Sequence, residues 1–206
     1  DEIHNFISRI VNGSKLARSI YNHMMTAKNI KMVLLSGTPI INQPYEIATL
    51  INLIRGPMDV YELSLLKASK PPVKANIIKT LTDNNLIKYV DELYFDDNNI
   101  YIMLLTNGFV KDNELNIKKE NWSNDEKIII GNITKALNKS DLKISIKTKT
   151  TSYYALPNIK EEFDKLFIDD TDVENIKVKN EDLFKRRVLG TLSYYKTTGS
   201  EFFPTM

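Results

Sequence analysis

The sequence predicts an α/β fold, with a parallel sheet and a crossover helix at its N-terminal end, from three observations. An acidic pair, Asp1-Glu2, stands where a strand would end. Residues 14–28 carry apolar side chains at helical spacing, and residues 30–35 form a short apolar run typical of buried parallel strands. Strand end, helix and buried strand make a βαβ unit of ordinary size. Because ligands bind beyond the carboxyl ends of such strands, we expect the two strand ends to lie together.

The helix predicted over residues 14–28 has a clear start and one apolar face. Ser14 suits the N-cap position, because its hydroxyl can accept a hydrogen bond from a free backbone N–H of the first turn. The apolar residues that fall on one helical face are Leu16, Ile20, Met24 and Ala27. We expect this face to point into the core.

Two short motifs stand on either side of this helix. Asp1-Glu2-Ile3-His4 matches a DExH pattern, and the later apolar run ends in Ser36-Gly37-Thr38-Pro39. A four-letter motif alone is common by chance, whereas the two motifs with one helix between them are far more specific. This arrangement resembles motifs II and III of superfamily 2 helicases and Swi/Snf-type ATPases.

The resemblance implies roles for the first motif in phosphoryl transfer, where catalysis rests on positioning and on neutralising the charge of the phosphates. Asp1 resembles the Walker B aspartate that holds Mg²⁺. Glu2 resembles the carboxylate that orients and deprotonates the attacking water. His4 lies where the family couples nucleotide state to neighbouring motifs. The alternative is a solvated acidic pair at a chain terminus beside an ordinary surface histidine.

The resemblance also implies a coupling role for the second motif. The hydroxyls of Ser36 and Thr38 would bond the DExH residues and relay hydrolysis to the second lobe. Gly37 permits a tight backbone turn, and Pro39 fixes the exit of the chain. The alternative is a plain turn after a strand, since all these residue types form turns readily.

A second helix is predicted to follow. Gln43-Pro44-Tyr45-Glu46 reads as its start, with proline in the first turn, and Gly56-Pro57 as its end. The apolar residues at helical spacing are Ile47, Leu50, Ile51 and Ile54. The stretch 42–57 resembles the Swi/Snf segment after motif III, where a helix closes off the first RecA-like lobe.

The middle of the chain predicts a small α+β module of three strands and about two helices. A helical pattern through Tyr61, Leu65 and Leu66 is broken at Lys70-Pro71-Pro72. Residues 123–126 have the spacing of a capping box. The other expected elements are a helix over 73–81, a hairpin of strands over 89–95 and 100–105, a helix with the apolar stripe Ile129, Ile130, Ile133 and Leu137, and a half-exposed strand over 142–154.

A narrower resemblance lies near the C-terminal end. The segment 183–190, LFKRRVLG, followed by Ser193-Tyr194-Tyr195 and Pro204, is similar to one in the DEAD/Swi/Snf-like helicases of large nucleocytoplasmic DNA viruses. These viruses include giant amoeba viruses, and the relatives include poxvirus-type nucleoside triphosphatases. The resemblance is good at both ends of the chain and thin between them.

The resemblance implies a division of the chain into three parts. Residues 1–58 would be the second half of a RecA-like P-loop lobe, a parallel sheet with helices that carries motifs II and III. Residues 59–157 would be an inserted α+β module. Residues 158–206 would be a helical segment leading toward the second helicase lobe.

Basic residues at one helix are candidates for contact with nucleic acid. Arginine is scarce in this chain, yet Arg186 and Arg187 are adjacent and follow Lys185. Arginine binds phosphate well because its planar fork of N–H donors matches the oxygen geometry. The expected helix has an apolar side of Phe184, Val188, Leu192 and Tyr195. The alternative is that the arginines pair with nearby carboxylates at 169–170 or 181–182.

The composition excludes several classes of protein. The chain of 206 residues has 42% apolar and 26% charged residues, which is ordinary for a globular protein. A net charge of +2 gives no overall attraction to nucleic acid, so binding depends on local patches. The absence of cysteine excludes disulfides and thiolate metal sites, and two histidines argue against zinc. No apolar run is long enough to span a bilayer, so no membrane partner is expected.

Two functions remain for the chain. The sequence contains no GxxxxGK[ST] loop, so we expect a fragment of a longer ATPase that does not hydrolyse ATP by itself. One hypothesis is a helicase or translocase that uses ATP and Mg²⁺, binds DNA or RNA and acts in viral transcription or replication. The other is a non-catalytic RecA-like docking module of a viral transcription complex. Both imply an intracellular location, in a viral factory of the host cytoplasm or in the virion.

Overall fold

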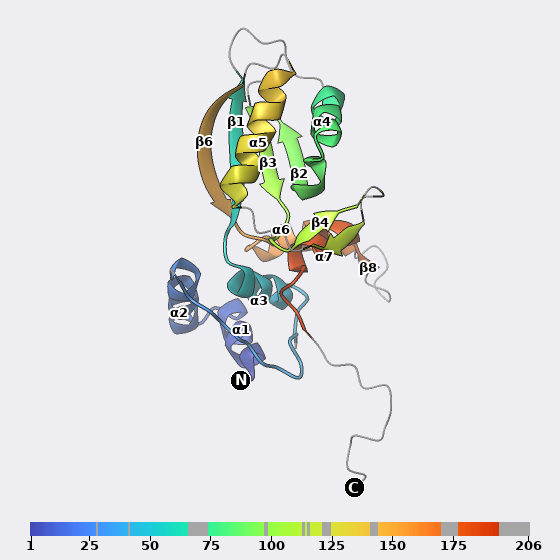
Figure 1. Cartoon of the computed structure of the whole chain (residues 1–206). Helices are drawn as coiled ribbons and strands as arrows, with labels where there is room; N and C mark the ends of the chain where they lie inside the picture. Colours follow the sequence, from blue (N-terminus) through green and yellow to red (C-terminus); the bar gives the residue numbers. More distant parts are fainter. Residues whose placement is uncertain are drawn as a thin grey trace.

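The computed structural model contains a helical part and a sheet part, with two further helices between them (Figure 1). It describes residues 1–27, 29–40, 42–65, 74–96, 99–112, 114, 116–120, 125–140, 144–169 and 177–193, with the backbone alone at 144–153. Mixed α/β structure is therefore confirmed. Within the described residues, none of the helices combines the length and apolar character needed to cross a membrane.

The largest sheet has four antiparallel strands in the order β2-β3-β1-β6. The strands are β1 (Met58–Leu65), β2 (Val90–Phe95), β3 (Asn99–Leu104) and β6 (Ile144–Tyr153). The predicted hairpin is confirmed, because β2 and β3 pair in antiparallel register with Phe95 opposite Ile100. The predicted strand over 142–154 is also confirmed as β6, which pairs with β1.

Strand β1 corrects the prediction of a helix through Tyr61 and Leu65. Both faces of this strand are covered: Met58 and Val60 belong to one hydrophobic core, and Tyr61 and Leu63 belong to another. A strand buried on both faces has no simple alternation of apolar and polar residues. In β1 apolar and polar residues are mixed without strict alternation, so its sequence does not read as a half-buried strand.

The second of these cores lies between the sheet and two helices. Helices α4 (Lys74–Asp83) and α5 (Glu126–Lys139) pack over it, as Figure 1 shows. The predicted stripe of α5 is confirmed, because its members Ile129, Ile130, Ile133 and Leu137 are all buried. The N-cap is Asp125, whose carboxylate accepts a hydrogen bond from the Lys127 N–H at 3.1 Å. Ser123, the cap expected from the sequence, lies outside the described residues.

The first core joins the N-terminal helices to the C-terminal ones. It contains α1 (Ile3–Val11), α2 (Lys15–Thr26), α3 (Glu46–Arg55), α6 (Lys160–Phe167) and α7 (Glu181–Val188). The predicted helix α3 is confirmed, and it ends at Gly56, whose φ of 72° favours glycine. Between α6 and α7, the Phe167 ring lies 5.4 Å from the Phe184 ring in an edge-on arrangement. Segments far apart in the sequence thus share one core.

A buried amide fixes α3 to the chain that leaves β6. Asn52 is fully buried, and its side chain donates to the Leu156 carbonyl and accepts from the Leu156 N–H, each at 2.8 Å. Burial of this amide is tolerated because its oxygen and its amino group both have hydrogen-bond partners. The contact brings the end of the sheet module against the N-terminal helices.

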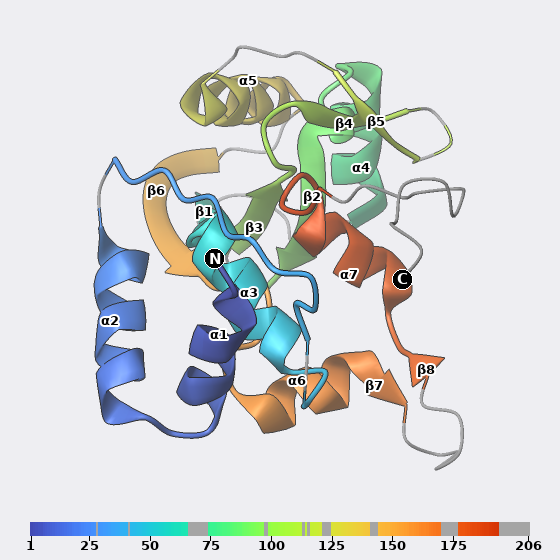
Figure 2. The same ribbon diagram turned by 90° about the horizontal axis from the view of Figure 1, so that it is seen from below.

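The parallel strand predicted over residues 30–35 is wrong for this structure. Residues 30–35 have no assigned secondary structure, and Val33 and Leu35 are 84% and 58% exposed. All strand pairs among the described residues are antiparallel, and none includes this segment. A parallel strand requires a neighbouring strand to accept its hydrogen bonds. The βαβ unit is therefore not formed, and Figure 2 shows an extended chain between α2 and α3 instead.

The buried face of α2 also differs from the expected one. The residues that enter the core are Ala17 and Tyr21, whereas Leu16 is 72% and Ile20 is 44% exposed. The N-cap prediction is confirmed, because Ser14 Oγ accepts from the Ala17 N–H at 3.3 Å. The first half of the expected apolar stripe thus faces solvent, whereas its member Met24 packs against the core.

Three short elements complete the described structure. A 3-10 helix, η1 (Ile87–Tyr89), lies against β4 (Phe109–Lys111), which pairs with β5 (Ile117–Lys119). Strands β7 (Ile168–Asp169) and β8 (Lys177–Val178) form a small antiparallel pair between α6 and α7. Helix α7 ends at Val188, before Leu192, which is half-exposed, and Tyr195 lies outside the described residues.

Candidate functional site

The two sequence motifs meet in the structure although the parallel strand is absent. His4 Nδ1 lies 2.7 Å from Ser36 Oγ, a hydrogen-bond distance. The Ile3 N–H donates to the Leu35 carbonyl at 3.1 Å, so the main chains of the two motifs are also joined. Helix α1 begins directly after Glu2, which sets His4 in its first turn and turns the ring toward the second motif. The expected contact between a DExH residue and the second motif is present.

The polar groups around His4 form a short chain of contacts. Glu2 Oε2 lies 3.0 Å from His4 Nδ1, and Ser36 Oγ accepts a hydrogen bond from the Thr38 N–H at 3.2 Å. The His4 side chain is only 12% exposed, whereas that of Glu2 is 58% exposed. The imidazole therefore links a solvent-facing carboxylate to a hydroxyl of the second motif. Because one ring nitrogen contacts both groups, a change of charge at Glu2 can alter the hydrogen bonding of Ser36.

The first two residues have the chemistry of a minimal cation site. The Asp1 carboxylate accepts a hydrogen bond from the Glu2 N–H at 2.9 Å, and both residues are exposed. In the part of the chain that the structure describes, no three histidine or acidic side chains are grouped to hold a metal ion. Mg²⁺ is commonly held by one or two carboxylates together with phosphate oxygens and water. Asp1 fits that pattern as a single protein ligand.

The basic cluster on α7 has protein partners. Arg187 is buried, and its guanidinium lies 3.4 Å from Asp91 Oδ2 and donates to Glu92 Oε2 at 2.8 Å. Arg186 Nε donates to Asp91 Oδ1 at 2.7 Å. Lys185 is exposed and pairs with Glu181 within the helix at 2.8 Å. The arginines are thus ion-paired, but with Asp91 and Glu92 and not with the carboxylates named in the alternative; contact of the cluster with nucleic acid stays a prediction.

The carboxylates that receive these arginines were not identified from the sequence. Asp91 and Glu92 begin strand β2, far along the chain from α7, and the Asp91 side chain is 1% exposed. An acidic pair at the start of a strand has no local pattern that marks it as an ion-pair partner. The one available hint is that acidic residues are rarely buried unless they are paired.

A further arginine, at the end of α3, fixes the end of α7. Arg55, the last residue of α3, donates to the Arg187 carbonyl at 2.8 Å. Burial, followed by repulsion from the Arg187 guanidinium, lowers the pKa of Arg55. Cations near the last turn of a helix also interact favourably with its free carbonyls. Helix α7 is thus tied to the sheet by its side chains and to α3 by its backbone.

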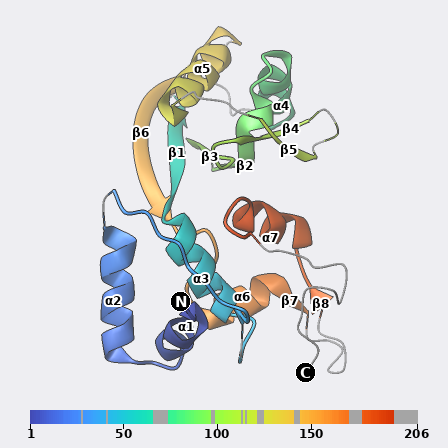
Figure 3. The ribbon, with the colours of Figure 1, turned by 60° about the horizontal axis from the view of Figure 1, so that its bottom comes forward.

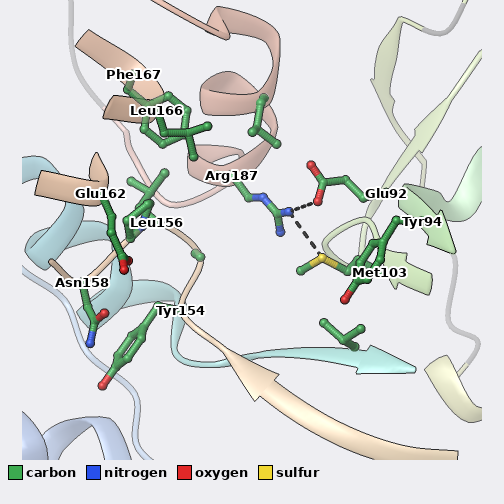
Figure 4. A pocket seen from close by; sticks show the side chains of 14 residues that line it. Glu92, Tyr94, Met103, Tyr154, Leu156, Asn158, Glu162, Leu166, Phe167 and Arg187 are labelled. Atoms are coloured by element: carbon green, nitrogen blue, oxygen red, sulfur yellow. Dashed lines mark hydrogen bonds and ion pairs between the residues drawn. The ribbon is translucent and has the colours of Figure 1, made fainter. Parts of the chain in front are cut away.

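A cavity lies beside this junction, between the sheet and helices α6 and α7 (Figure 4). Its volume is about 360 Å³. In Figure 4 the Arg187 side chain reaches from α7 toward Glu92 and Met103. It passes beside an apolar wall of the cavity. That wall includes Leu156, Leu166 and Phe167, and Tyr94 lies on the opposite side beside Met103. Because the guanidinium is already paired, the cavity offers mainly apolar contacts.

Part of the chain is similar to viral helicase-like nucleoside triphosphatases. African swine fever virus proteins named termination factor NPH-I homolog are 39% identical over 59 residues, which is 27% of this chain and 8% of theirs. A protein of Acanthamoeba polyphaga mimivirus, named as a candidate ATP-dependent RNA helicase, is 41% identical over 64 residues, again 27% and 8%. The chain thus spans about 8% of the length of these curated relatives. No protein-family profile and no solved structure matches it.

Proposed function

We propose that this chain is part of an ATP-dependent helicase or translocase that acts on viral DNA or RNA in transcription or replication. The observation that carries the proposal is the contact of His4 with both Glu2 and Ser36, at 3.0 and 2.7 Å. The partial identity to helicase-like viral proteins supports it. ATP, Mg²⁺ and nucleic acid are the ligands that this function requires.

We also infer a RecA-like lobe for residues 1–58 in the longer protein. Two apolar surfaces support this inference: the exposed stripe of α2 with Leu16 and Ile20, and the exposed run that contains Val33 and Leu35. Monomeric proteins rarely expose adjoining apolar surface unless it contacts something. Neighbouring parallel strands would cover both surfaces at once and would pair the free backbone of residues 30–35. The sheet module and α6–α7 would then follow as an insertion and a bridge to the second lobe.

The proposed reaction gives each motif residue a distinct task. Bound Mg²⁺ would neutralise charge on the phosphates, with Asp1 as its protein ligand. The exposed Glu2 carboxylate orients the attacking water and accepts its proton. His4 holds that carboxylate at its Nδ1 atom and contacts Ser36 Oγ with the same atom. The protonation of Glu2 would thereby alter the hydrogen bonding of the second motif.

Glu2→Gln in the full-length parent tests this function. We expect nucleotide binding to persist while steady-state ATP hydrolysis falls by about 10²–10⁴-fold, because the amide keeps the shape and removes the base. Glu181→Gln, an exposed glutamate on α7, is the matched control and should hydrolyse ATP at the wild-type rate. Wild-type turnover in the Glu2 variant would contradict the assignment. If the parent does not bind ATP and neither substitution changes any measured activity, the docking-module alternative is favoured instead.

The remaining parts of the proposal concern partners and location. The second helicase lobe of the same parent chain and the viral transcription machinery are the protein partners that we propose. The named function of the African swine fever virus relatives, termination, supports a place in transcription. We propose an intracellular location, in the viral factory of the host cytoplasm or in the virion.

A further inference from the structure

A second cleft lies at the other end of α1 from the acidic pair. It has a volume of about 590 Å³, within the range of about 300–1,000 Å³ typical of small-ligand sites. Helices α1, α2 and α3 form one side, and the chain from Tyr154 to Glu161 forms the other. Figure 3 shows the helices α1, α2 and α3 that form this side. Ile10 and Val11 line it, so the nine-residue helix α1 separates it from Glu2 by about 13 Å.

Aromatic rings dominate the lining. Tyr21 is buried, Tyr45 is half-buried, and Tyr154 is 41% exposed at the edge of the cleft. The Tyr45 hydroxyl donates to the Asn158 carbonyl, which fixes that ring against the opposite wall. Tyr154 and Asn158 also line the neighbouring cavity drawn in Figure 4. The exposed ring of Tyr154 is therefore the one that can take a flat partner against its face.

Polar groups of two kinds complete the cleft. Gln43 Oε1 is buried and has no hydrogen-bond partner within the described residues. Gln43 also lines a neighbouring cavity beside α6, so this buried atom does not by itself assign a ligand to the cleft. Two cations, Arg18 and Lys160, and one carboxylate, that of Glu161, are among the lining residues. Lys160 Nζ also lies 3.8 Å from Asp164 Oδ2 in an exposed ion pair. Arg18 Nε donates to the Ile10 carbonyl at 3.2 Å, which places its side chain between α2 and α1.

We propose that this cleft binds one unpaired nucleotide of a single-stranded nucleic acid. The combination of an exposed aromatic face with nearby cations suits a base and its phosphate, because stacking and phosphate contact together hold single strands without sequence preference. The proposal deepens the proposed function, since it adds a nucleic-acid contact on the face opposite the acidic pair.

Binding of a short labelled strand to the chain itself tests the proposal, with no ATP hydrolysis involved. The probe is a fluorescent oligo(dA) of about eight nucleotides, followed by anisotropy, with the corresponding duplex and free AMP as competitors. Tyr154→Ala should weaken strand binding about ten-fold, and Tyr154→Phe should leave it unchanged because the ring remains. Lys160→Gln should lower the slope of log affinity against log salt by about 0.7.

Matched controls separate the cleft from general surface effects. Tyr94→Ala removes a ring of nearly equal exposure, 42%, on strand β2, and Lys79→Gln removes an exposed cation on α4. Neither should change strand binding. If Tyr154→Ala lowers the thermal midpoint, its loss of strand binding can come from unfolding. The proposal is then tested by Tyr154→Phe, which should bind as wild type does, and by Lys160→Gln, which should lower the salt slope.

Several results would overturn the proposal. Strand binding that survives Tyr154→Ala within two-fold of wild type, or that weakens equally in Tyr94→Ala, would place the contact elsewhere. Equal affinity for the duplex would exclude an unpaired base. Binding of AMP with the same variant pattern, together with no strand binding, would assign the cleft to a free nucleotide instead. A strand-binding result leaves the hydrolysis test on Glu2 untouched, so the two proposals fail separately.

Discussion

Replacing Arg187 tests the junction between helix α7 and the sheet. Its guanidinium is 7% exposed and faces Asp91, whose side chain is 1% exposed, and Glu92. In Arg187→Gln the Asp91 carboxylate would keep Arg186 at 2.7 Å and lose its second cation in a buried setting. Breaking a buried pair by removing one partner costs about 3–5 kcal/mol, because a charge is left poorly compensated.

The expected effect is large enough for a simple melting experiment. For a chain of this length, each kcal/mol shifts the midpoint by about 2–4 °C, so Arg187→Gln should lower it by about 10 °C. Circular dichroism melts of the isolated chain measure this, with a urea titration as an independent check on the free energy of unfolding. Lys185→Gln is the control on the same helix, because both side chains of the Lys185–Glu181 ion pair are exposed. The thermal midpoint of this variant should match that of the wild type.

A double-mutant cycle then assigns the loss to the contact itself. If Asp91 and Arg187 are coupled, Arg187→Gln with Asp91→Asn should be less destabilised than the sum of the two single variants, by about 0.5–3 kcal/mol. Two results would refute the reasoning. One is a midpoint for Arg187→Gln that matches that of Lys185→Gln, and the other is strict additivity in the cycle.

Three further predictions concern coupling, alkaline pH and nucleic acid. In the parent, Ser36→Ala with Thr38→Ala should impair strand separation or translocation more than ATP hydrolysis, and equal losses in both assays would reduce these residues to structural support. Burial and a hydrogen bond to a glutamate raise the pKa of Tyr61, so the unfolded chain ionises first above pH of about 10 and the free energy of unfolding falls as pH rises. Urea midpoints measured between neutral and alkaline pH should fall less steeply in Tyr61→Phe than in wild type, with Tyr154→Phe as control. Arg186→Gln changes the more exposed of the two arginines. It should lower the slope of log nucleic-acid affinity against log salt by the amount expected for about one phosphate contact. An unchanged slope would mean that Arg186 serves only in its ion pair with Asp91.

Local signals in the sequence predicted about half of the helices and strands that the structure describes, and missed α1, α6 and the short strands. The spacing Ile47, Leu50, Ile51 with Gly56 after it defines α3, and the stripe of α5 appears at the same residues in the structure. Helix α5 buries one face, so its helical period is visible in the sequence, whereas α3 is buried from Glu46 to Leu53 and is marked by its apolar spacing and its end signals. Strand β1 is the counterexample, since two cores cover its two faces and remove the alternation that marks a half-buried strand.

Long-range partners could not be predicted in this way. The pairing of Arg186 and Arg187 with Asp91 connects residues separated by 95 and 96 positions, and no local spacing records it. Scarcity of arginine suggested that the cluster is functional, while the ion-pair partners that the structure gives the arginines lie on strand β2. The outcome shows that residue type alone does not separate a phosphate contact from an internal anchor; burial does, and burial depends on the fold.

The contact between the two motifs shows which part of the candidate site is independent of the missing sheet. Residues 30–35 have no strand partner among the described residues, yet the Ile3 N–H still reaches the Leu35 carbonyl and His4 still reaches Ser36. These contacts come from the start of α1, whose first turn carries the Ile3 N–H donor and the His4 ring. The relay from Glu2 to Ser36 therefore rests on a local arrangement of helix and extended chain. Neighbouring strands in the longer protein would cover the exposed apolar run and hold this arrangement in place, while the polar contacts themselves would remain those of Glu2, His4 and Ser36.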